Sequence, residues 1–236
     1  NGDDPTENDP IVVSGSVVVV DHTLTLKTKA WKAGATPSDI TTDAYTIGGG
    51  APSGLVSAGG YHSLTLKPDG TVFAWGANWY GQLGDGTQTD RRAPLQVPGL
   101  APVTAIAAGA GGAHSLALTS DGTVWAWGDN YYGQLGDDTI WESVTPIPVT
   151  GLSDVVGVAA GYGHSLALKG DGTVWAWGDN YYGQLGDGDE GTTYRVTPLP
   201  VTGLSGIIGI SAGEYHSLAL KDDGTVWAWG YNYYGQ

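Results

Sequence analysis

The sequence predicts an all-β fold built from small repeated sheets, and three observations support this. The 236 residues include 40 Gly and 12 Pro but only one Phe and no Met, which favours many tight turns over long helices. The tripeptide His-Ser-Leu recurs at His62, His114, His164 and His216, so a similar unit returns every 50 to 52 residues. Three to four short strands in a unit of about 50 residues, with Gly-rich corners, are typical of a propeller blade.

The chain divides into three segments. Residues 1–47 carry no copy of the repeat, and their alternating apolar and polar residues predict part of a β-sandwich. Residues 48–54, GGGAPSG, are predicted to be a Gly-rich linker. Residues 55–236 are assigned to the repeats, of which the last is incomplete.

Each repeat is expected to contain a central β-hairpin. The run HSLALTSDGTVWAWG (114–128) holds two alternating stretches joined at Asp-Gly, a strong hairpin signal. The turn needs a residue that tolerates a positive φ, and each repeat supplies a glycine there: Gly70, Gly122, Gly172 and Gly224.

A further strand is expected on each side of the hairpin. Apolar runs at 103–109, 155–161 and 207–213 precede the hairpins and are predicted to be buried strands. The runs TPIPV (145–149) and TPLPV (197–201) are predicted to be edge strands, because proline has no N–H to donate to a neighbouring strand and is tolerated at the edge of a sheet.

The motifs AG-x-x-HS-x-x-L, DG-x-V-x-x-WG and N-x-x-GQLG resemble the RCC1 repeat of the regulator-of-chromosome-condensation family. The resemblance covers about three quarters of the chain. It implies a β-propeller with about four of an expected seven blades present, so we expect the sequence to be a piece of a longer polypeptide. Either the missing sequence or neighbouring chains would then close the ring.

Residues 1–47 resemble the C-terminal half of the chitobiase/β-hexosaminidase C-terminal-type module. That module is a small Ig-like sandwich found as a spacer in secreted bacterial and archaeal proteins. Its expected first strands are missing here. The resemblance implies an extracellular or cell-surface location.

Composition limits the partners. The net charge of −15 argues against nucleic acid, which demands a basic surface. The absence of Cys removes thiolate catalysis and thiolate metal sites. No run of about 18 apolar residues occurs, so we expect no membrane insertion in this segment.

The repeated histidines and tryptophans are expected to be structural. Adjacent His and Ser residues in a strand point to opposite faces, so they form no nucleophilic dyad, and each histidine is expected to bond a loop backbone. The tryptophans two residues apart, such as Trp125 and Trp127, lie on one face and are expected to pack blade against blade.

The loop N-x-Y-G-Q-L-G has two interpretations. Its glycines suit corners between closely packed backbones, and Asn130, Asn180, Gln134 and Gln184 are expected to cap backbone groups. Its aromatic residues are the candidate ligand-binding residues, for weak repeated contacts with a protein or a glycan. They are Trp79, Tyr80, Tyr131, Tyr132, Tyr181, Tyr182, Tyr233 and Tyr234.

No catalytic residue, metal site or cofactor is predicted. The loop GDGDEG (186–191) resembles a calcium loop only in part, because glycine and proline stand where an EF-hand places ligands, and a solvated acidic loop is favoured. Near-identical repeats place the same groups in every blade, whereas an active site needs different groups to converge. We therefore expect that the protein is not an enzyme.

The sequence thus favours a binding or structural propeller of a secreted or cell-surface microbial protein, used in adhesion, assembly or ligand display. Its partner would be a protein, a glycan or another copy bound through open blade edges. Two alternatives are a guanine-nucleotide exchange factor-like interaction propeller and a glycan-binding accessory module of a larger enzyme. The resemblance places exchange activity beside an inserted β-wedge, for which the uniform repeat spacing leaves no room.

Overall fold

The computed structural model describes residues 17–19, 24–28, 41–45, 55–189 and 193–236, and side chains within 55–189 and 193–236. All the described secondary structure is β, which confirms the predicted class. Within these residues no helix has the length and apolar character needed to cross a membrane. The predicted linker 48–54 lies outside the described residues.

Residues 55–236 form four consecutive antiparallel sheets, each of which is one blade. Blade 1 contains β4 (Leu55–Ala58), β5 (His62–Leu66), β6 (Val72–Gly76) and β7 (Arg91–Gln96). Blade 2 contains β8 (Val103–Ala108), β9 (His114–Thr119), β10 (Val124–Gly128) and β11 (Ser143–Pro148). Blade 3 contains β12 (Val155–Ala160), β13 (His164–Lys169), β14 (Val174–Asp179) and β15 (Tyr194–Pro200). Blade 4 contains β16 (Ile207–Ala212), β17 (His216–Lys221) and β18 (Val226–Gly230).

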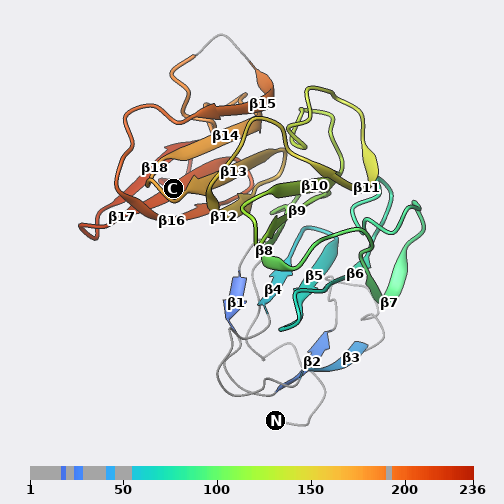
Figure 1. The fold of residues 1–236 in the computed structure, drawn as a ribbon. Coiled ribbons are helices and arrows are strands. Elements are labelled where there is room, and N and C mark those ends of the chain that lie inside the picture. The colour runs from blue at the N-terminus through green and yellow to red at the C-terminus, as the bar shows by residue number, and fades with distance from the viewer. Residues whose placement is uncertain (1–16, 20–23, 29–40, 46–54, 190–192) are drawn as a thin grey trace.

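The strands of each blade lie side by side in chain order. The first strands, β4, β8, β12 and β16, contact one another near the middle of the molecule, and β7, β11 and β15 lie toward the outside (Figure 1). The predicted buried strands before each hairpin and the predicted Pro-bearing edge strands are therefore confirmed. The predicted turns are also found, with Gly70 at φ +83° and Gly122 at φ +82°.

The region before the blades contributes three described strands: β1 (Val17–Val19), β2 (Leu24–Thr28) and β3 (Thr41–Tyr45). β1 pairs with β4 and so extends the sheet of blade 1, while β2 pairs with β3. Most of the predicted sandwich of residues 1–47 lies outside the described residues, so its Ig-like character stays a prediction.

Three hydrophobic clusters lie between successive blades. Between blades 2 and 3, for example, Leu116 and Val124 of blade 2 pack with Trp177 of blade 3, and Trp175 packs at the margin of the same cluster. Trp127 is buried in the equivalent way between blades 1 and 2. The prediction that the tryptophan pairs pack blade against blade is confirmed for blades 2 and 3, whereas in blade 4 Trp229 packs and Trp227 is exposed.

Blade 4 has one face that no described blade covers. Leu168 and Val174 of blade 3 are buried by blade 4. Their equivalents in blade 4, Leu220 and Val226, are 40% and 65% exposed. This is an apolar sheet face open to solvent.

Candidate interaction surface

One backbone carbonyl links each pair of neighbouring blades. The Gln82 carbonyl in blade 1 accepts the Ser115 hydroxyl at 2.8 Å and the Trp127 indole N–H at 2.9 Å, both from blade 2. The Gln134 carbonyl accepts Ser165 and Trp177 of blade 3 in the same way. Both lone pairs of each carbonyl are thus used between blades.

The histidines complete this link. His62 Nε2 lies 2.8 Å from Ser115 Oγ, and equivalent contacts join His114 to Ser165 and His164 to Ser217. Because the Ser115 hydroxyl has one hydrogen and donates it to Gln82, it must accept from the histidine. The histidine therefore carries its proton on Nε2, and Nδ1 has no hydrogen-bond partner among the described residues.

Burial keeps these imidazoles neutral. Desolvation lowers the pKa of His62 to about 4, and desolvation together with the neighbouring His164 and His62 lowers the pKa of His114 to about 3. Burial likewise lowers the pKa of His164 to about 3. The structural role predicted for the histidines is found, but the predicted partner is wrong. His62, His114 and His164 each bond a serine of the next blade, because the packing of the blades places that hydroxyl 2.8 to 3.1 Å from Nε2.

The N-x-Y-G-Q-L-G loop caps itself as predicted. Asn130 Oδ1 accepts the Leu135 N–H at 2.9 Å, and Gln134 Oε1 accepts the Tyr132 N–H at 2.9 Å. The predicted close approach is also present, because a Cβ on Gly133 would lie 2.8 Å from the Val196 Cα of the next blade. The loop is a corner between blades.

Blade 1 differs from blades 2 and 3 at one buried hydrogen bond. Gln134 Nε2 donates to Asp129 at 3.0 Å, and Gln184 Nε2 donates to Asp179 at 2.9 Å. Position 77 holds alanine, so the fully buried Gln82 Nε2 has no acceptor among the described residues.

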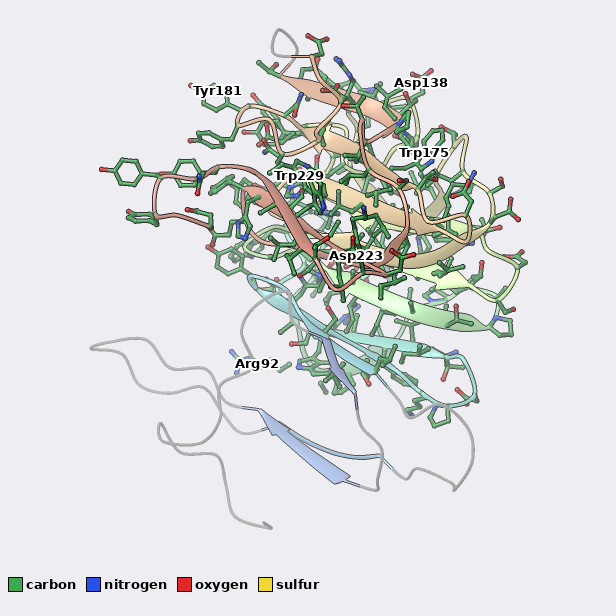
Figure 2. The ribbon with its side chains drawn as sticks, turned by 90° about the vertical axis from the view of Figure 1, so that its left-hand side faces the viewer. Arg92, Asp138, Trp175, Tyr181, Asp223 and Trp229 are labelled. Carbon is green, nitrogen blue, oxygen red and sulfur yellow. The ribbon has the colours of Figure 1, made fainter. Side chains whose placement is uncertain are left out.

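The aromatic side chains of the same loops remain on the surface. Of the eight candidate residues, Trp79, Tyr80, Tyr131, Tyr181, Tyr182, Tyr233 and Tyr234 are exposed and Tyr132 is half-buried. Figure 2 shows Tyr181 projecting from the edge of the molecule, whereas Trp229 lies within it.

The structure gathers part of this set into one group, which we call the tyrosine cluster. It joins blades 3 and 4 through ring contacts of 4.8 to 6.5 Å between centroids. Its members are Tyr162, Tyr181, Tyr182, Tyr215, Tyr231, Tyr233 and Tyr234.

Other candidates lie in smaller groups. Tyr131 and Tyr132 form an edge-to-face pair at 4.9 Å, and Trp79 pairs with Tyr61 at 5.5 Å. Tyr132 also reaches toward blade 3, because a Cβ on Gly163 would lie 2.8 Å from its Cδ2.

Sequence reasoning missed Tyr162, Tyr215 and Tyr231 as surface residues. Tyr162 and Tyr215 stand in the short stretch between the AG and HS of the repeat motif, and Tyr231 directly precedes the loop asparagine. The residues at these positions differ from one repeat to the next, and this difference was the sequence feature that could have identified them as surface residues. Only the packing of blades 3 and 4 brings the three together.

Two carboxylates, those of Asp179 and Glu214, lie near these rings. Asp179 is nearly buried and accepts from the Tyr181 N–H at 3.0 Å as well as from Gln184. Burial raises its pKa, partly offset by these hydrogen bonds. Desolvation raises the pKa of Tyr215, and the nearby Tyr162 and Glu214 add to the rise.

Two aspartates of the predicted acidic loop pair with an arginine, while residues 190–191 of that loop lie outside the described residues. Arg195 forms ion pairs with Asp187 at 2.8 Å and Asp189 at 2.7 Å. Asp187 is nearly buried, so the expectation of a solvated acidic loop is wrong at this residue. Among the described residues, no three His, Asp or Glu side chains are grouped to hold a metal.

Comparison with known proteins identifies a family match. The RCC1-like domain family matches residues 56–236, which is more than half of the chain. This stretch contains all four blades except the first residue of β4.

The chain is similar to human proteins named as ubiquitin ligases. It is 38% identical over 185 residues to the E3 ubiquitin-protein ligase HERC2 of Homo sapiens, an alignment covering 77% of this chain and 4% of HERC2. It is 40% identical over 185 residues to the probable E3 ubiquitin-protein ligase HERC4 of Homo sapiens, covering 77% of this chain and 18% of HERC4. The chain therefore spans less than a fifth of the length of these relatives.

Two solved structures have a similar fold. Human WBSCR16 superposes with a TM-score of 0.67 and 28% identity, covering 75% of this chain and 46% of WBSCR16. Prp20p from Saccharomyces cerevisiae superposes with a TM-score of 0.67 and 26% identity, covering 81% of this chain and 48% of Prp20p.

These relatives correct one expectation. The prediction that the protein is not an enzyme is contradicted by relatives that are named E3 ubiquitin-protein ligases. The shared part is a small fraction of those proteins, so the match does not establish an enzymatic activity for this chain.

Proposed function

Because the chain belongs to the RCC1-like domain family, we propose that it works as a protein-interaction propeller whose binding face carries the tyrosine cluster. The predicted RCC1-type blades are confirmed by this membership. One observation carries the proposal. The serine hydroxyls and tryptophan N–H groups of the repeats are bonded between blades, while most aromatic residues of the N-x-Y-G-Q-L-G loops stay exposed.

Exposed tyrosines suit protein recognition for a physical reason. Each offers a large apolar ring and a hydroxyl at low entropic cost, which is why tyrosine is enriched in interface cores. Tyr181, Tyr182, Tyr233 and Tyr234 are all more than 40% exposed and lie in one connected group.

Site-specific photo-cross-linking tests this proposal. A benzophenone amino acid would replace Tyr181, and in a matched variant it would replace Asp223 at the hairpin turn of blade 4, away from Tyr181 (Figure 2). Protein adducts are expected from position 181 and not from position 223. Equal adducts from both positions, or adducts from 223 alone, would overturn the proposal.

A nucleotide-exchange role is a second candidate, favoured by one neighbour. The solved Prp20p structure is described together with the binding of Prp20p to Gsp1p and histones. A nucleotide-release assay on a panel of small GTPases tests this role. Acceleration by the chain supports it, and an unchanged release rate across the panel rejects it.

Self-association is a third proposal, supported by the exposed face of blade 4. Burying Val226 and Leu220 against a second copy would remove apolar surface from water. Sedimentation velocity is expected to show a concentration-dependent dimer that Val226→Asp abolishes. A monomer at all concentrations would exclude it.

Glycan binding is a further proposal, supported by the exposed rings, and a change of tryptophan fluorescence with polysaccharides tests it.

We also propose an extracellular or cell-surface location. The acidic charge, the lack of Cys and the resemblance of residues 1–47 to secreted spacer modules support this. Fractionation of the source cells should recover the protein from the medium or the surface, and recovery from cytosol alone would contradict the location.

A further inference from the structure

Tyr182 is the centre of the tyrosine cluster. Its ring lies 4.9 Å from Tyr181, 5.5 Å from Tyr215 and 4.8 Å from Tyr231, measured between centroids. Tyr162 extends the group through Tyr215, at 5.3 Å. These rings come from loops at the same end of blades 3 and 4, where the strands that begin at His164 and His216 start.

The electrical character of this end is negative. Asp179 is close enough to the cluster to accept from the Tyr181 N–H and to raise the pKa of Tyr215, and the Glu214 carboxylate lies beside Gly111 of blade 2, where a Cβ on that glycine would meet it at 2.9 Å. Asp129 occupies the position in blade 2 that Asp179 occupies in blade 3. Ring faces add to this potential, because an aromatic quadrupole places negative charge on the face.

Among the described residues, the lysines of blades 3 and 4 lie away from the cluster, and Arg195, which pairs with Gly178 beside the cluster, is engaged by carboxylates. The cluster loops, residues 161–163, 179–184, 213–215 and 231–236, contain no Lys or Arg. Lys169 and Lys221 end β13 and β17, at the opposite end of the strands from the cluster. Arg195 is held by Asp187 and Asp189.

We propose that the tyrosine cluster, together with Asp179 and Glu214, docks a Lys- and Arg-rich segment of a partner protein. An ammonium or guanidinium group over Tyr182 or Tyr215 gains cation–π attraction, and the carboxylates favour the same charge. Charge complementarity selects this occupant over a glycan, because the net charge of −15 attracts a cation and does not attract a neutral sugar, which can only hydrogen-bond to the carboxylates. The inference rests on the proposed protein-interaction function and specifies the partner's chemistry.

Calorimetric titration with defined peptides tests the inference. The probes are a 12-residue peptide of alternating Lys, Arg and Ser, the same peptide with Gln in place of every Lys and Arg, and a cello-oligosaccharide. We expect the cationic peptide to bind about tenfold or more tightly than either other probe, with an affinity that falls as salt rises.

Variants separate docking at the cluster from diffuse attraction to an acidic protein. Tyr182→Ala and Tyr215→Ala are each expected to lower the affinity for the cationic peptide about 5- to 30-fold, because each removes a desolvated cation–π contact. Trp141→Ala, which removes an exposed aromatic residue outside the cluster, is expected to leave binding unchanged. Glu214→Gln should weaken binding several-fold, while Asp222→Asn, the same charge change beyond the end of β17, should not.

The outcomes are distinct. Equal binding of the neutral peptide, binding of the sugar alone, or equal losses in the cluster and control variants would overturn the inference. If Tyr182→Ala lowers the unfolding midpoint, Glu214→Gln decides instead, since it removes the charge and keeps the side-chain volume, and Tyr182→Phe, which keeps the ring, is expected to bind the cationic peptide as the parent protein does. Cross-linking at position 181 without cationic binding would leave the proposed function standing and reject this inference, whereas failure of both would reject both.

Discussion

His114 in blade 2 donates a hydrogen bond from Nε2 to the hydroxyl of Ser165 in blade 3, across 3.0 Å, and both side chains are fully buried. Ser165 passes its own hydrogen to the Gln134 carbonyl of blade 2. Two consecutive hydrogen bonds therefore connect blade 2 to blade 3 and blade 3 back to blade 2. Together with the Trp177 N–H bond to the same carbonyl and the apolar packing, they fix the relative position of the two sheets.

Ser165→Ala should destabilise the protein by about 1–3 kcal/mol, because it leaves the buried His114 Nε2–H without an acceptor. Urea unfolding followed by tryptophan fluorescence measures the change. The exposed Ser153→Ala should change stability by less than about 0.5 kcal/mol. Equal effects from the two variants would contradict the blade-linking role.

Stability should fall as the pH is lowered from about 6.5 toward 4. The pKa of His62 is about 4 in the folded protein, and those of His114 and His164 are about 3, so the unfolded chain binds more protons in this range. The contribution is complete above the unfolded pKa and is lost as the pH falls toward the folded values. Each histidine contributes a slope of up to about 1.4 kcal/mol per pH unit.

Unfolding free energies measured between pH 7.5 and 4.5 check this dependence. His164→Gln removes one of the titrating groups and keeps an amide donor, so its slope should be shallower than that of the parent protein. A slope that is unchanged in this variant would assign the pH dependence to other groups.

Ala77→Asp should stabilise the protein by about 1 kcal/mol. The new carboxylate would accept a hydrogen bond from Gln82 Nε2, as Asp129 accepts one from Gln134. The buried Gln82 amide would then no longer lack an acceptor. Asp129→Ala is the reciprocal change and should destabilise by a similar amount. Chemical denaturation of both variants tests the pair, and a destabilising Ala77→Asp beside a neutral Asp129→Ala would refute it.

Gly136→Ala should destabilise the protein more than Gly151→Ala. Both glycines have a positive φ, +68° and +76°, so both variants carry backbone strain of roughly 1–2 kcal/mol. A Cβ at Gly136 would also lie 2.8 Å from Trp177 Nε1 of the next blade, whereas one at Gly151 meets nothing within 4 Å. The difference between their unfolding midpoints measures the steric cost of a Cβ against Trp177. Equal midpoints would show that the neighbouring blade moves to accommodate the Cβ at little cost.

Features carried by neighbouring residues could be predicted from the sequence. The Asp-Gly turn at Gly122 needs a positive φ, and the prolines at 146 and 148 restrict β11 to an edge, so both follow from local backbone chemistry. The capping by Asn130 acts over five residues and was likewise predictable. Repetition of these local rules was enough to indicate blades.

Contacts between blades were decided by the tertiary structure. His114 reaches Ser165 across 51 residues, and Tyr182 meets Tyr231 through the packing of blade 3 on blade 4. The repeat motif predicts that each blade has a His, a Ser and exposed rings, but it does not predict the angle by which one sheet is rotated against the next. That rotation follows from the volume of the buried side chains between the sheets, such as Trp177 and Leu116. It sets which groups bond and which rings gather on the surface.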